Sequence, residues 1–75
     1  MAEKKPDYRK LVKEVRKQLG VSQEDLAREI GVSFATINRW ENGQVQPSRL
    51  ARNHFHAFCD RMEKEGRLSL PERMK

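Results

Sequence analysis

Three residues in the last third of the chain carry side chains of the metal-binding type: His54, His56 and Cys59. On a helix, His54 and His56 are two positions apart and point to different sides, whereas His56 and Cys59 share a face. Two ligands on one face are too few for a zinc site, which takes three or four from the protein. The sequence therefore predicts no bound metal, and Cys59 is interpreted as a small semi-buried side chain.

A catalytic cysteine would need a base within hydrogen-bond reach and a group that orients that base. The residues around Cys59 supply no such set, and the chain shows no pattern of nucleophile, base and oxyanion donors. We therefore expect neither an enzyme nor a cofactor. A single cysteine also excludes an intramolecular disulfide, so the fold must depend on its core.

The balance of charge favours a polyanionic partner. The chain has 75 residues, which is one domain, and its 16 Lys and Arg against 11 Asp and Glu give a net charge of +5. Such a surplus favours nucleic acid over a membrane surface. However, within residues 21–47 acidic residues outnumber basic ones, so the surplus flanks that segment. Charge alone therefore leaves two interpretations open, nucleic-acid binding and solvated helix faces.

The apolar spacing predicts a helix near each end of the chain. Residues 7–19 have a helical stripe, with Asp7 as N-cap and Gly20 at the end. A long helix over 49–65 begins after Ser48 and carries the apolar positions Ala51, Phe55, Phe58 and Met62. This second stripe either completes the core against the first helix or forms a dimer face. Residues 1–6 are expected to be a disordered lead, 7–66 the domain, and 67–75 a tail.

Between these two helices, the sequence predicts two short helices separated by a tight turn. The first, 23–30, begins at Ser22, and Asp25 completes a near capping box. Gly31 ends it, Ser33 caps the next helix over 34–42, and Gly43 follows. Two short helices joined by a glycine turn form a helix-turn-helix geometry. Ala27 is small where the two helices must cross closely.

The stretch from Gln23 to Gly43, QEDLAREIGVSFATINRWENG, resembles the lambda-repressor and Cro type of helix-turn-helix family, also called the xenobiotic-response-element family. Ala27, Gly31, Ile37 and the closing Glu41-Asn42-Gly43 fall in register with its motif. The resemblance implies an all-α fold: a compact four- to five-helix, lambda-repressor-like DNA-binding domain, here with a long C-terminal helix. It also implies a small transcriptional regulator that binds double-stranded DNA sequence-specifically, with helix 34–42 in the major groove.

The resemblance assigns base contacts to the outer face of that recognition helix: Phe34, Ala35, Asn38 and Arg39. Arg39 would pair with O6 and N7 of a guanine, while Phe34 and Ala35 would touch a thymine methyl. Two assignments stay open. Asn38 would bind adenine or a phosphate, and Phe34 would contact DNA or cover the turn.

Further positions match family residues that bind phosphates or hold the fold. The phosphate contacts implied by the resemblance are Gln23, Ser33, Thr36 and Asn42, which set register without specifying sequence. Arg16 and Glu41 match a family ion pair that ties the first helix to the third. Arg49 and Arg52, at the start of the last helix, are equally consistent with phosphate contact and with a solvated face.

The chain departs from the family in two respects. Phe34 and Ala35 stand where phage repressors have glutamines, and one long helix replaces two short ones, which leaves family-style dimerisation open. An alternative function is a protein-interaction module or antitoxin-type adaptor, which predicts a large exposed apolar patch on the last helix or tail. A homodimer and a protein partner are therefore open. With no membrane-length apolar run or signal peptide, a cytoplasmic, nucleoid-associated protein is expected.

Overall fold

The computed structural model describes residues 6–71 and 74 of the chain. Within them, the secondary structure consists of four helices and no strand: α1 (Tyr8–Leu19), α2 (Gln23–Ile30), α3 (Phe34–Glu41) and α4 (Arg49–Lys64). The all-α prediction is confirmed. The predicted helices over 34–42 and 49–65 each run one residue too far, because Asn42 and Glu65 are the C-caps of α3 and α4.

Short polar side chains start each helix, as the sequence predicts. Asp7 accepts a hydrogen bond from the backbone N–H of Arg9, and Ser22 and Asp25 form a complete capping box at the start of α2. The side chains of Ser33 and Ser48 each accept a backbone N–H in the first turn of α3 and α4. These caps satisfy backbone N–H groups that have no partner inside the helix, so the helix starts are fixed locally.

The turn between α2 and α3 depends on one glycine. Gly31 has φ 86°, in the left-handed region that costs other residues energy. Its N–H and that of Val32 both donate to the carbonyl of Ala27, at 2.8 and 3.0 Å. The chain therefore turns within three residues, 31–33, before α3 begins.

The helices enclose one hydrophobic core. Its largest fully buried side chains include Trp40 of α3 and Phe55 of α4, whose ring centroids lie 6.3 Å apart in an edge-on arrangement. Phe58 and Met62 are also buried, so the apolar stripe of α4 completes the core. The question whether this stripe is a dimer face is thereby answered in favour of the core.

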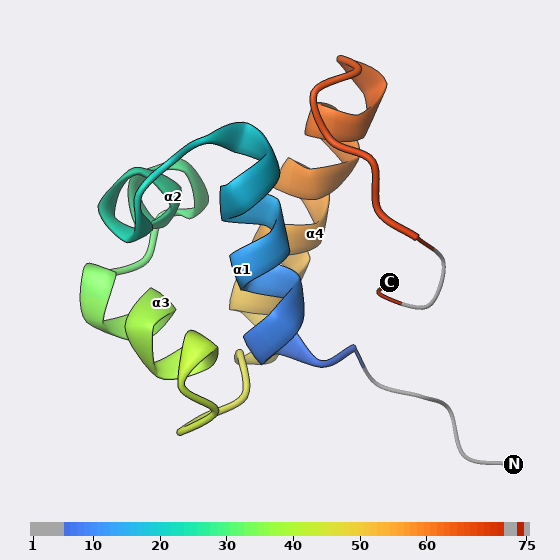
Figure 1. Ribbon diagram of the computed structural model, residues 1–75. Coiled ribbons are helices and arrows are strands. Elements are labelled where there is room, and N and C mark those ends of the chain that lie inside the picture. Colours follow the sequence, from blue (N-terminus) through green and yellow to red (C-terminus); the bar gives the residue numbers. More distant parts are fainter. Residues whose placement is uncertain (1–5, 72–73, 75) are drawn as a thin grey trace, which may run out of the picture.

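Figure 1 shows the arrangement that results. The helices α2 and α3 lie on one side of α1, and α4 crosses behind α1. Contacts join α3 to both α1 and α2. One side of α3 therefore packs on these two helices, while its other side faces away from the molecule. No helix in the described part of the chain is both long enough and apolar enough to cross a membrane.

The residues after α4 pack back onto the domain. Leu68 is buried in the core, and the backbone of Ser69 makes two hydrogen bonds with the side-chain amide of Gln18, both 2.8 Å. The sequence pattern treats this segment only as a tail, because its partner on α1 lies far away in the chain. The predicted lead at residues 1–6 lies, apart from Pro6, outside the described residues.

Candidate nucleic-acid interface

Helix α3 has a buried face and an exposed face. Ile37 and Trp40 are buried against α1 and α2, since no more than 2% of either residue is accessible. On the opposite side, Phe34 is 50% accessible and Ala35 and Arg39 are exposed, with Asn38 half-buried at the edge. The four residues predicted to contact bases therefore share the outer side of one short helix.

Arg39 is the charged residue of this outer face. Within the described residues its guanidinium has no hydrogen-bond or ion-pair partner, whereas Arg28 of α2 is bound to Asp25 at 2.7 Å. A free guanidinium presents its N–H donors in a rigid fork that matches the two acceptors of a guanine edge or a phosphate. The ring of Phe34 and the methyl of Ala35 add apolar surface on the same side.

Hydroxyl and amide groups stand at the two ends of α3. Ser33 Oγ accepts the backbone N–H of Thr36 at 3.1 Å and lies 2.8 Å from Thr36 Oγ1. Asn42, the C-cap, is exposed. The N-terminal hydroxyls therefore stabilise the start of the helix, where the partial positive charge of the backbone suits an anion.

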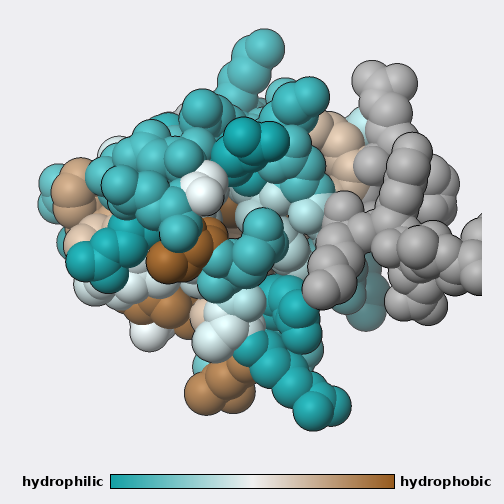
Figure 2. Space-filling model, turned by 90° about the horizontal axis from the view of Figure 1, so that it is seen from below, coloured by the Kyte–Doolittle hydropathy of each residue, from teal (hydrophilic) through white to brown (hydrophobic). Residues whose placement is uncertain are grey.

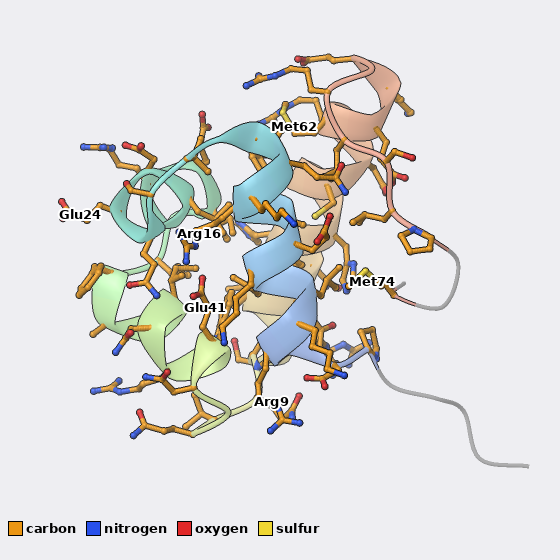
Figure 3. The ribbon with its side chains drawn as sticks, viewed as in Figure 1. Arg9, Arg16, Glu24, Glu41, Met62 and Met74 are labelled. Carbon is orange, nitrogen blue, oxygen red and sulfur yellow. The ribbon has the colours of Figure 1, made fainter. Side chains whose placement is uncertain are left out.

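An ion pair connects α3 to α1. Arg16 Nε lies 2.6 Å from Glu41 Oε2, and Arg16 Nη2 lies 2.9 Å from Glu41 Oε1, so the contact is bidentate. Arg16 also reaches the carbonyl of Val21 at 3.4 Å, at the entry to α2. Figure 3 shows the two side chains extending toward each other between the helices. The pair thus fixes α3 relative to both of its neighbours.

The carboxylate of Glu41 is ionised in this setting. Burial raises its pKa, but hydrogen bonds from Arg16 and Gln23, with the charge of Arg16, outweigh burial and leave the pKa below the usual 4.5. The same hydrogen bond to Glu41 raises the pKa of Arg16. Both groups therefore carry their charge at neutral pH, and the buried carboxylate acts only as an acceptor.

Gln23 belongs to the same polar cluster. Its amide Nε2 donates to Glu41 Oε1 at 3.0 Å and to Asn38 Oδ1 at 3.4 Å. The family resemblance, which assigns Gln23 to a phosphate, does not predict these internal contacts. The sequence does contain one indication of the cluster, because Asn38 and Glu41 are three residues apart on α3 and so share a helix face.

Two of the three residues with metal-binding side chains, His56 and Cys59, take part in the packing of the domain. His56 Nε2 is 2.8 Å from the hydroxyl of Tyr8, and burial lowers the pKa of His56. Cys59 is buried, and burial, with the charges of Glu63 and Asp60, raises the pKa of its thiol to about 12. No group of three or more potential ligands occurs in the part of the chain that the structure describes.

The face seen in Figure 2 is mostly hydrophilic, and its hydrophobic spots are separate from one another. Among the described residues the large exposed apolar side chains are Phe34, Val45 and Leu50, which belong to α3, the following loop and α4. Arg49 is exposed and Arg52 half-buried at the start of α4. The surface around α3 is therefore polar, with Phe34 as its main apolar feature.

Comparison with known proteins agrees with this geometry. A family model described as helix-turn-helix matches residues 12–50, slightly more than half of the chain. Over 40 residues the chain is 48% identical to an uncharacterized HTH-type transcriptional regulator of Methanothermobacter thermautotrophicus. The aligned segment covers 53% of this chain and 58% of that relative, so the chain spans less than two thirds of the relative's length. No solved structure matches the chain.

Proposed function

This chain belongs to the helix-turn-helix family, as the segment from Gln23 to Gly43 predicts, and we propose that it binds double-stranded DNA by placing α3 in the major groove. The family's domain is a DNA-binding regulatory one, and the relative described above carries a regulator's name. The proposed function is therefore that of a small transcriptional regulator with sequence specificity. Such a protein acts where genomic DNA lies, at the nucleoid.

Base recognition is assigned to the outer face of α3. Arg39 donates two N–H groups to O6 and N7 of a guanine, and this role is supported by its guanidinium, which has no partner in the described part of the chain. Phe34 and Ala35 contact a thymine methyl, for which the half-exposed ring of Phe34 is available. Asn38 stands next to Arg39 on the same side and contacts a second base.

Phosphate contacts are assigned to the ends of α2 and α3. Ser33 and Thr36 lie at the start of α3 and Asn42 at its end, where they can bind the backbone of the same groove. The side-chain amide of Gln23 already donates to Glu41, so we assign the phosphate contact of Gln23 to its backbone N–H in the first turn of α2.

The observation that carries the proposal is the contrast between the two faces of α3. One face is buried on α1 and α2, and the other presents an aromatic ring, a carboxamide and an arginine that has no partner among the described residues. The alternative, a protein-interaction module, requires a large apolar patch. On α4, Leu50 is the large apolar side chain that is exposed among the described residues, and a single side chain favours DNA binding over that alternative.

The proposal is tested by titrating isotope-labelled protein with a short random-sequence duplex at low salt and following backbone amide signals by NMR. We expect the largest shifts in α3 and the first turn of α2, and weaker binding at high salt because phosphate contacts release counterions. Arg67→Ala is a matched control for Arg39→Ala, since each removes one positive charge and Arg67 belongs to the segment after α4, which lies away from α3 (Figure 1). Shifts centred on α4, or equal losses in both variants, would contradict it.

A further inference from the structure

The polar cluster beneath α3 has a fixed order of donors and acceptors. It begins at the ion pair, where Arg16 supplies only donors and Glu41 only acceptors. Because Glu41 Oε1 accepts from Gln23 at 3.0 Å, the amide of Gln23 must turn its nitrogen, not its oxygen, toward the carboxylate. The ionised carboxylate thus decides between the two orientations of the Gln23 amide, which are otherwise equivalent in shape.

The orientation of the Gln23 amide in turn fixes the orientation of the Asn38 amide. The nitrogen of Gln23 has a second hydrogen, and Asn38 Oδ1 lies 3.4 Å from that nitrogen. If the Asn38 amide were reversed, two NH2 groups would face each other, which is unfavourable for both donors. Asn38 therefore turns its oxygen inward to Gln23, and its Nδ2 group is the one left for the groove beside Arg39.

We propose that Asn38 is a specificity-determining residue that selects guanine over adenine, and that Gln23 is the positioning residue that imposes this preference. The inference rests on the proposed function. An asparagine that pairs with adenine must turn its oxygen to N6 and its nitrogen to N7 at the same time. With the oxygen held by Gln23, Asn38 offers N–H donors alone, and guanine presents two acceptors, N7 and O6, on its groove edge.

Three variants separate the two roles. Asn38→Ala removes the contact and identifies the base pair that it governs. Asn38→Asp keeps an oxygen for Gln23 but replaces the outward donor by an acceptor, so the preferred base should change to one with an amino group, cytosine or adenine. Gln23→Ala frees the Asn38 amide to turn, so adenine should become acceptable at the same position.

Gln18→Ala is the matched control for Gln23→Ala. The amide nitrogen of Gln18 also donates twice, to Glu14 and to the carbonyl of Ser69, but its contacts lie on α1 and the segment after α4. Each variant is first checked for a cooperative thermal transition. If Gln23→Ala fails to fold, the base that wild-type protein prefers at the position governed by Asn38 still tests the inference, because an Asn38 amide that could turn would accept adenine.

The experiment is selection from a randomised duplex library by wild-type protein and by each variant. In wild type, guanine should exceed adenine by about tenfold at the position that Asn38→Ala relaxes. This ratio should fall to near one in Gln23→Ala, stay unchanged in Gln18→Ala and reverse in Asn38→Asp. Adenine at that position in wild type would overturn the inference, as would a uniform loss of binding in Gln23→Ala with the guanine preference kept.

Failure of the inference and failure of the proposed function look different. A motif that is enriched and depends on Arg39, but has no position that Asn38 governs, overturns the inference alone. If wild-type protein enriches no motif, the role of Asn38 fails together with the proposed base recognition.

Discussion

Residues of one type have different roles in this domain, and their surroundings decide which. The side chain of Arg16 is only 25% accessible and is bound at two points to a carboxylate that is 4% accessible. Arg39 is exposed and its guanidinium is unpaired among the described residues. The first arginine therefore holds α3 in place, and the second is left for a partner. Sequence alone separates them only through their positions in the family motif.

Breaking the ion pair should destabilise the protein far more than breaking a surface pair. Arg16→Met leaves the buried carboxylate of Glu41 without its counter-ion, and we expect the free energy of unfolding to fall by about 3 kcal/mol. Arg28→Ala is the control, because the Arg28 side chain is 75% accessible and such pairs contribute about 0–1 kcal/mol. Urea denaturation at neutral pH measures both, and equal losses would contradict the structural role of the pair.

The ion pair also predicts how stability depends on pH. The pKa of Glu41 lies below 4.5 in the folded protein and near 4.5 in the unfolded chain, so the unfolded state binds the proton more readily. This contribution is present above pH 4.5 and is lost as the pH falls through the lower, folded-state pKa. The difference in unfolding free energy between wild type and Glu41→Gln should therefore shrink on acidification. A difference that is constant with pH would show that Glu41 has an ordinary pKa.

At the level of elements, local signals position the helices and distant contacts orient the side chains. The start and end of α2 follow from Ser22, Asp25 and Gly31, which act within one turn of the helix. These are predictable from sequence because cap and turn chemistry is local. The orientation of the Gln23 amide is not predictable in this way, since it depends on Glu41, 18 residues away.

The turn between α2 and α3 gives a prediction about backbone strain. Gly31 has φ +86°, and a Cβ added there would have no neighbour within 4 Å. Gly31→Ala should therefore cost about 1–2 kcal/mol through the left-handed conformation alone. Gly31→Asn should cost less, because asparagine tolerates this region better than alanine does. Thermal denaturation of both variants tests this, and an alanine variant as stable as wild type would mean that the turn adopts another conformation.

At the scale of the whole molecule, a small core combines residues from every helix and from the segment after α4. Tyr8 of α1 contacts Phe55 edge-on with ring centroids 6.1 Å apart, and Leu68 is buried in the same core. The apolar spacing in α4 predicts its buried face, whereas nothing in the sequence around Leu68 indicates where that segment packs. Contacts between residues far apart in the chain are therefore the part of the fold that periodicity misses.

Cys59 provides a test of how tightly this core is closed. The thiol is buried, and its pKa of about 12 leaves almost no thiolate at neutral pH. We expect iodoacetamide to modify Cys59 very slowly in native buffer and rapidly in urea, with a midpoint that matches unfolding measured by circular dichroism. Fast modification in native buffer would show that the core around α4 opens without global unfolding.

The central claim is that α3 recognises base sequence in DNA, and selection from a randomised duplex library at two salt concentrations tests it most directly. Wild-type protein should enrich a motif that contains a guanine, and Arg39→Ala should lose that guanine and about 1–3 kcal/mol of binding free energy, while Arg67→Ala keeps the motif. A palindromic motif would indicate that two copies bind. Salt-sensitive binding that enriches no motif would contradict base recognition, and the absence of any binding would contradict the proposed function itself.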